Sequence, residues 1–342
     1  MPTPQRDPAT AASFGGPGWQ PRPASHAEEI AAGCIWAPYR VHSEVARLEA
    51  VLLAWPGGEL ALDDDPDAHL MLAPVSVPAI QRQAAAVAEF FRAQGVRVHV
   101  ARPASPPPPN FIFQRDLFFM TPEGAVLGRP AGLQRAGEER FSAEALAQVG
   151  VPILRTLTGR ATFEGADALW LRPDLVLLGL GLRTNPAGAD QVAGVLAEQG
   201  VRLQRTALPR TGVQHLLGVL TPVAEDLCLV HGGHASDEHL GVLHDLGIEP
   251  LVIPPGPELT HGRANNVVAL APRRVVMPAG CPETRALLEA HGVLCFALDV
   301  GEYVKAAGAL GCLTGILSRA SYTPPNHPTN AANPSSRSVL GA

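Results

Sequence analysis

Apolar residues recur in the same order five times along the middle of the chain. Helical stretches with apolar residues at three- and four-residue spacing follow strand-like apolar runs, for example at residues 79–94, 187–199 and 282–290. Each helical stretch reaches a glycine, which is typical of a helix C-terminus, and then a second strand-like run. The first runs span residues 49–58, 124–130, 175–185, 226–233 and 273–280, and the second runs span 94–103, 149–157, 199–208, 246–254 and 291–299.

A third apolar segment in each unit contains a polar residue. These segments span residues 110–120, 162–171, 213–220, 263–270 and 308–317, and their polar members are Asp116, Glu164, His215, Asn265 and Cys312. The intervals between these members are 48, 51, 50 and 47 residues, which is the length of one unit. The repeat predicts an α/β fold, a five-bladed α/β propeller of strand-helix-strand-strand units of about 50 residues. In such a fold the five polar residues would meet at the centre.

The two ends of the chain differ from the repeated middle. Residues 1–30 and 321–342 are rich in Pro, Ala, Gly, Ser and Asn and show no apolar periodicity, so they are predicted to be disordered tails. Residues 31–320 are predicted to form a single catalytic domain.

The composition of the chain indicates which kinds of ligand and which cellular location to expect. The net charge of -6 argues against a nucleic-acid partner and suits a small cationic ligand. No apolar run is long enough for a membrane span, and the N-terminus lacks a secretory signal pattern, so the expected location is cytoplasmic. A homodimer is a possible assembly. Five cysteines without a CxxC pair indicate free thiols.

The polar residues of the repeat suit attack on a carbon atom. A cysteine nucleophile commonly works with a histidine from elsewhere in the chain, and Cys312 and His215 fit that pairing. The carboxylates Asp116 and Glu164 would repel each other at one centre, so they imply a cation between them. A planar guanidinium has the N–H donors for this position.

Six motifs in order resemble one superfamily over roughly residues 40–320. The chain is similar to the arginine deiminases, dimethylarginine dimethylaminohydrolases and amidinotransferases, which share the pentein fold. The motifs are VHSEVARLEAVLLAWPG at 41–57, NFIFQRD at 110–116, TFEGAD at 162–167, GLRTN at 181–185, QHLLG at 214–218 and AAGALGCLTGIL at 306–317. Ala166 stands where the family has a second glycine.

The resemblance implies a role for each matched residue. Cys312 would attack the guanidino carbon and form a covalent thiouronium with loss of an amine or ammonia, and His215 would protonate the leaving nitrogen and then activate water. Asp116 and Glu164 would hold the guanidinium nitrogens. Hydrolysis would give a ureido product such as citrulline, with no metal or organic cofactor. The candidate substrate-binding residues are Asn110, Arg135 and Arg183 for the α-carboxylate, together with Asp167 and Leu217.

Leu217 departs from the family pattern. Enzymes that act on an unmodified guanidinium commonly have Asp two residues after the catalytic His, where this chain has Leu217. Residues two apart in a strand share a face, so Leu217 should point toward the same centre as His215. An unpaired guanidinium N–H against leucine is costly, so the sequence predicts a preference for an N-substituted arginine-like substrate or a neutral ureido one.

Three other functions remain open from the sequence. An amidinotransferase would resolve the covalent adduct with an amine. A metal-dependent ureohydrolase would use His231, His234, Asp237 and His239 of HGGHASDEH, although this segment also fits a helix start capped by Ser236 or Asp237. A non-catalytic binding propeller is the fourth possibility, in which Cys312 and His215 are core residues.

Overall fold

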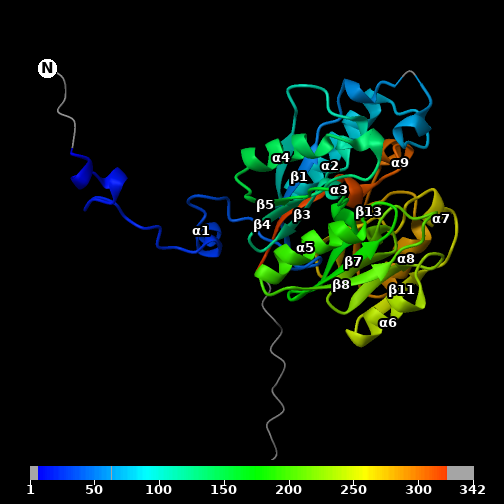
Figure 1. Ribbon diagram of the computed structural model, residues 1–342. Helices are drawn as coiled ribbons and strands as arrows, with labels where there is room; N and C mark the ends of the chain where they lie inside the picture. Colours follow the sequence, from blue (N-terminus) through cyan, green and yellow to red (C-terminus); the bar gives the residue numbers. More distant parts are fainter. Residues whose placement is uncertain (1–6, 63, 322–342) are drawn as a thin grey trace, which may run out of the picture.

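The computed structural model describes residues 7–62 and 64–321 (Figure 1). Its helices are α1 (His26–Ala32), α2 (Val77–Ala93), α3 (Gln114–Leu117), α4 (Glu138–Gln148), α5 (Pro186–Glu198), α6 (Asp237–Asp245), α7 (Pro257–Thr260), α8 (Pro282–Ala290), α9 (Gly301–Lys305) and α10 (Leu310–Leu313). Its strands are β1 (Leu48–Ala54), β2 (Arg97–Ala101), β3 (Phe118–Thr121), β4 (Gly124–Leu127), β5 (Ile153–Thr156), β6 (Ala168–Arg172), β7 (Leu175–Leu180), β8 (Arg202–Ala207), β9 (Leu220–Ala224), β10 (Leu227–His231), β11 (Glu249–Ile253), β12 (Val268–Ala271), β13 (Arg274–Pro278), β14 (Leu294–Leu298) and β15 (Gly315–Arg319).

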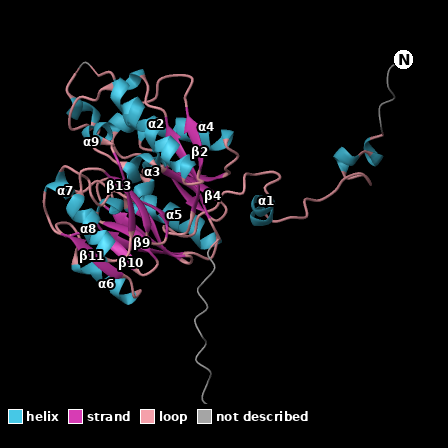
Figure 2. Cartoon of the chain, turned by 180° about the vertical axis from the view of Figure 1, so that it is seen from behind, coloured by secondary structure: helices cyan, strands magenta, loops and turns pink. Residues whose placement is uncertain are grey.

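The strands of the described residues form five separate three-stranded sheets. Their orders are β15-β1-β2, β3-β4-β5, β6-β7-β8, β9-β10-β11 and β12-β13-β14. In each of these orders the middle strand pairs antiparallel with the first strand of its sheet and parallel with the third. Helices α2, α4, α5, α6 and α8 connect the middle strands to the third strands, and they surround the sheets in both views (Figures 1 and 2).

The predicted five-bladed propeller is wrong. A propeller blade is a four-stranded antiparallel sheet. Here each sheet has only three strands, and none of the sheets closes or curls on itself. A helix crossover returns the chain in the same direction, so the third strand must pair parallel with the middle one. The repeat of apolar segments indicates the order of the elements, but it does not indicate how many strands each sheet contains or how the remaining strand of each unit pairs.

The connecting helices follow directly from the apolar pattern. In α2 the buried residues Ile80, Ala84, Val87 and Phe91 recur at three- and four-residue spacing and so lie on one face. Gly95 follows this helix with a φ of 78°, a left-handed conformation that glycine adopts without strain. Equivalent glycines after the other four helices confirm the predicted helix ends: Gly150, Gly200, Gly247 and Gly292.

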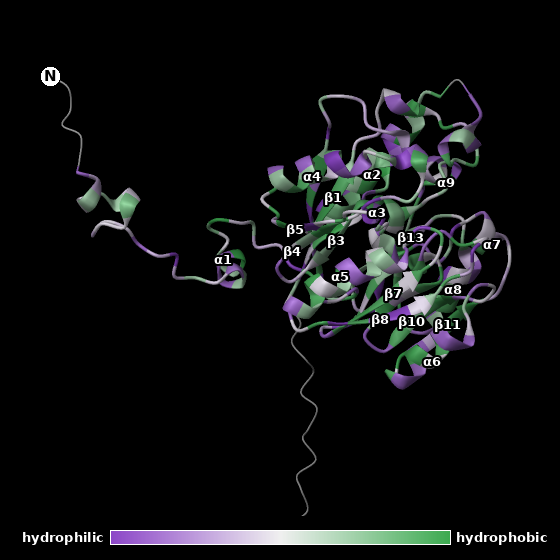
Figure 3. Ribbon diagram, in the orientation of Figure 1, coloured by the Kyte–Doolittle hydropathy of each residue, from purple (hydrophilic) through white to green (hydrophobic). Residues whose placement is uncertain are grey.

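The first strands of the sheets lie in the interior. All residues of β3, β9 and β15 are buried, and β15 contacts β3 while β9 contacts β12. Figure 3 shows hydrophobic residues concentrated in the strands and hydrophilic ones along the outer helices. The turns that precede these first strands are therefore brought to one region.

The ends of the domain stay a prediction. Within the predicted N-terminal tail, α1 begins at a capping box in which Ser25 and Glu28 bond each other's backbone N–H groups. Residues 1–6, and all but residue 321 of the predicted C-terminal tail, lie outside the described residues. In the part of the chain that is described, no helix has the length and apolar character needed to cross a membrane.

Candidate active site

The repeated polar residues occupy equivalent turns. Asp116 lies in α3 before β3, Glu164 precedes the short 3-10 turn Gly165–Asp167 before β6, and His215 precedes the turn Leu216–Gly218 before β9. Cys312 lies in α10 before β15. The assumption that His215 and Leu217 share a strand is wrong, because Leu217 lies in this helical turn and His215 is the residue that precedes it. Because these residues are spaced by one unit length, the side chains of Asp116, Glu164 and His215 nevertheless lie close together.

Arg135 lies between the two carboxylates. Its Nη1 donates to Asp116 Oδ2 at 2.7 Å and to Glu164 Oε2 at 3.1 Å, while Nε and Nη2 bind Glu138. All four side chains are buried. Burial by itself lowers the pKa of Arg135, but the three carboxylates outweigh it and raise the pKa well above the ordinary value. The cation that the sequence predicts between Asp116 and Glu164 is thus, in the free protein, a side chain of the chain itself.

His215 is held as an imidazolium. Its Nε2 lies 2.7 Å from Glu164 Oε2, and its Nδ1 lies 3.7 Å from Asp116 Oδ1. Burial lowers the pKa of His215, yet Asp116 and Glu164 outweigh burial and raise it to about 9. Burial also opposes ionisation of Glu164, but Arg135, His215 and Arg183 hold its pKa far below the ordinary range. His215 therefore carries a proton at neutral pH.

One carboxylate oxygen in this group has no hydrogen-bond partner. Asp116 Oδ1 is buried and accepts no hydrogen bond, whereas Oδ2 is bound to Arg135. An unsatisfied buried acceptor costs about 1 to 3 kcal/mol. A ligand N–H group that donates to Asp116 Oδ1 would remove that cost.

Asn266 positions the thiol of Cys312. The Asn266 amide donates from Nδ2 to Cys312 Sγ at 3.1 Å, and its Oδ1 accepts from the backbone N–H groups of Gly311 and Cys312. Burial and the charge of Asp116 raise the pKa of Cys312, while Asn266 and Arg263 act to lower it. The sequence pointed to Asn265, whose amide instead bonds Gly218 O. Asn266 is one position away, and the adjacent Asn pair was the signal.

The other candidates take three different positions. Asn110 and Arg183 line a small cavity with Asp116, Arg135, His215 and Cys312, and Arg183 bonds Glu164 Oε1 at 3.3 Å. Leu217 lines a second cavity with Cys312.

Asp167 lines neither of these two cavities. It accepts hydrogen bonds from the Thr184 hydroxyl and the Leu216 N–H, and so it fixes the turn that carries His215.

The two cavities share Gln214, His215, Ala307 and Cys312. The Asp116 cavity, named for its carboxylate, has a volume of about 20 Å³, and the second, the Arg263 cavity, about 60 Å³. Both are far smaller than an amino-acid ligand requires, so side chains must move when one binds.

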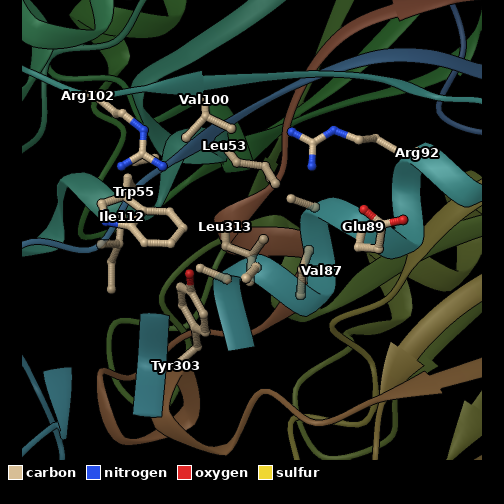
Figure 4. Close-up of a pocket in the computed structure, with 14 residues that line it drawn as sticks. Leu53, Trp55, Val87, Glu89, Arg92, Val100, Arg102, Ile112, Tyr303 and Leu313 are labelled. Carbon is tan, nitrogen blue, oxygen red and sulfur yellow. The ribbon is translucent and has the colours of Figure 1, made fainter. Parts of the chain in front are cut away.

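A third cavity of about 340 Å³ lies elsewhere, between α2 and the β1-β2 pair (Figure 4). Its walls are mainly apolar, and Arg102 stacks on the Trp55 ring at 4.1 Å. No cysteine or histidine lines it. The larger space therefore lacks the thiol and the imidazole that line the two smaller cavities.

Asp116, Glu164 and His215 also satisfy the spacing of a metal site, since one ligand atom of each lies within 4.8 Å of the others. Arg135 already bridges the two carboxylates. In the HGGHASDEH segment, Ser236 caps α6 as the sequence indicates, and His239 Nδ1 accepts from the Ser236 N–H. Among the described residues no potential metal group includes His231, His234, Asp237 or His239.

Comparisons with known proteins agree on one superfamily. The arginine deiminase family model matches residues 97–209. A dimethylarginine dimethylaminohydrolase of Streptomyces coelicolor is 28% identical over 206 residues, which cover 60% of this chain and 74% of the relative.

Two solved structures show the same fold. A cysteine-to-serine mutant of Pseudomonas aeruginosa dimethylarginine dimethylaminohydrolase, complexed with citrulline, has a TM-score of 0.66 at 22% identity and covers 80% of this chain and 100% of its own. An amidinotransferase of the saxitoxin pathway from Microseira wollei has a TM-score of 0.70 at 17% identity, with coverage of 84% and 98%.

Five mixed three-stranded sheets around a buried group of ionisable side chains thus define a pentein-fold protein. The family model, the relatives and the shared fold together support the superfamily of arginine deiminases, dimethylarginine dimethylaminohydrolases and amidinotransferases.

Proposed function

We propose that this protein is a hydrolase that cleaves a C–N bond of a guanidino amino acid, with Cys312 as the nucleophile. The relatives named dimethylarginine dimethylaminohydrolase and arginine deiminase support the reaction class. The observation that carries the proposal is the unpartnered Asp116 Oδ1, which faces His215 Nδ1 in a cavity that Cys312 also lines.

The substrate guanidinium would enter between Asp116 Oδ1 and Cys312. Asp116 and Glu164 would accept its N–H groups, with Arg135 shifting away from their shared face. A cation close to Sγ favours the thiolate, which offsets the burial that raises the pKa of Cys312 in the free protein.

The reaction then proceeds in two halves. Once the bound guanidinium favours ionisation, the thiol loses its proton to solvent and the thiolate Sγ bonds to the guanidino carbon. His215 transfers its proton to the leaving nitrogen, and the C–N bond breaks to release an amine or ammonia. Water then adds to the thiouronium carbon and gives a proton to neutral His215. The C–S bond breaks, which frees the thiolate, and the ureido product loses its remaining extra proton to solvent.

Substrate recognition divides between the two sides of the thiol. Arg183, whose buried Nε has no partner, and Asn110 would hold the α-carboxylate together with Arg135. Leu217 would contact the substituent on the terminal nitrogen. We therefore propose an N-substituted arginine, such as a methylated arginine, in preference to arginine itself.

The test is turnover of a panel of guanidino and ureido compounds, with products measured by mass spectrometry. Wild-type protein should release an amine and a ureido product, and Cys312→Ser should lose at least 99% of this activity while staying folded. The control, Cys34→Ser, changes an exposed thiol and should leave activity unchanged. Activity in Cys312→Ser would rule out the nucleophile, and amidino transfer without ureido product would identify an amidinotransferase.

A further inference from the structure

The Arg263 cavity differs in its ionisable groups from the Asp116 cavity. Arg263, His231 and His234 line it together with Gln214 and Leu217. Its lining contains no carboxylate. Cys312 therefore lines both a cavity that contains a carboxylate and a cavity whose other ionisable side chains are basic.

Arg263 is a half-buried cation without a counter-ion. Among the described residues its guanidinium makes no ion pair or side-chain hydrogen bond, and its Nε is buried without any partner. Arg135 and Arg183, in contrast, are bonded to carboxylates. The carboxylate of Glu258, in the preceding helix α7, accepts hydrogen bonds from the N–H groups of Glu283 and Thr284.

The backbone holds Arg263 in an unfavourable conformation. Its φ is 54°, a left-handed value that is uncommon for residues other than glycine. The preceding Gly262 packs so closely that a Cβ atom there would lie 2.7 Å from Cys281 Sγ. Three residues later the same loop carries Asn266, which bonds Cys312 Sγ. Strain of this kind persists where the surrounding structure requires it, and such positions cluster at functional sites.

His231 adds a hydrogen-bond donor rather than a charge. His231 Nδ1 accepts from the Gly233 N–H, which leaves Nε2 as the N–H of the neutral ring. The rings of His231 and His234 lie 4.2 Å apart between centroids. Burial lowers the pKa of His231, and His234 and Arg263 lower it further. An anion here would gain one full charge and a neutral donor.

Building on the proposed function, we propose that the Arg263 cavity is a subsite for a carboxylate carried by the substrate. The carboxylate has two possible origins. One is the N-substituent of the guanidinium, and the other is the α-carbon of the amino acid, which would replace the assignment of the α-carboxylate to Arg183 and Asn110. The Arg263 guanidinium binds it in either case, because a fork of N–H donors matches two carboxylate oxygens. A substituent with positive charge would be excluded.

The test measures binding rather than turnover, so it stands apart from the nucleophile. In the Cys312→Ser background, calorimetry would compare three probes: argininosuccinate, which has carboxylates on the N-substituent, N-monomethylarginine, which has only the α-carboxylate, and N-methylagmatine, which has no carboxylate. Arg263→Asn removes the charge and suits the left-handed backbone, whereas Arg263→Lys keeps the charge. The control Arg82→Asn removes an exposed charge on α2.

We expect Arg263→Asn to weaken argininosuccinate binding at least tenfold, Arg263→Lys to weaken it threefold or less, and Arg82→Asn to have no effect. Equal weakening of N-monomethylarginine would assign the subsite to the α-carboxylate, and weakening of argininosuccinate alone would assign it to the substituent. Unchanged binding of both would overturn the proposal. So would an equal loss for N-methylagmatine, because that would show a merely structural role. If wild-type protein showed no turnover while these differences in binding persisted, the proposed reaction would be rejected and the carboxylate subsite would stand.

Discussion

At the scale of single residues, Leu217 sets the expected choice between arginine and its N-substituted forms. The side chain is 5% exposed and lines the cavity beside Cys312. A buried methyl group gains about 0.8 kcal/mol from contact with leucine, whereas an unpaired N–H loses about 1 to 3 kcal/mol. Leu217→Asp should therefore shift the ratio of kcat/KM values toward arginine by tenfold or more. Leu217→Asn, of similar size but uncharged, should shift it much less, and an equal shift in both variants would refute the argument.

At the scale of elements, the turn before β6 is a tightly packed support of the site. A Cβ atom on Gly165 would lie 2.3 Å from Phe118 O and 2.6 Å from Arg115 O, and backbone atoms of this kind cannot move aside. Gly165→Ala should destabilise the protein by about 1 to 3 kcal/mol and displace Glu164. The urea midpoint of unfolding measures this loss. Gly194→Ala, at an exposed position of α5 where an added Cβ meets nothing within 4 Å, is the control. A Gly165→Ala protein as stable as wild type would show that the turn has room.

The same turns show what the sequence could and could not predict. Asp116, Glu164 and His215 are grouped as expected, because a spacing of one unit length places residues at equivalent turns of successive sheets. The roles assigned to them stay predictions. The turn geometry at His215, the choice of Asn266 over Asn265, and the parallel third strands were missed. Apolar periodicity identifies elements, but it does not specify strand pairing or a boundary to within one residue.

At the scale of the whole molecule, the buried charges make stability depend on pH. The pKa of His215 is about 9 in the folded protein against an ordinary 6.5, so folding favours the protonated form. This contribution is complete below about pH 6.5 and is lost as pH rises through 9, and the shift corresponds to about 3 kcal/mol. Burial raises the pKa of Glu138 and of Asp167 to about 7 in each case, which acts in the same direction.

The free energy of unfolding should therefore fall between pH 6 and pH 9, as measured by urea titration. In His215→Gln the fall should be smaller, while the control His244→Gln, at an exposed position, should behave like wild type. Equal slopes in His215→Gln and wild type would show that His215 is not the titrating group.

The charge balance of the site also predicts independence from metal ions. Arg135 supplies the positive charge between Asp116 and Glu164, where a metal would otherwise bind. Activity should survive exhaustive dialysis against EDTA. A loss of activity that manganese or zinc restores would instead support the ureohydrolase reaction.

The central claim is that Cys312 bonds to a guanidino carbon, and its most direct test is mass spectrometry of the protein quenched during turnover of N-monomethylarginine. The account predicts an adduct equal to the substrate less its leaving amine, mapped to the peptide that contains Cys312 and absent from Cys312→Ser. Product that accumulates with no adduct at any quench time, or an adduct on another cysteine, would contradict it.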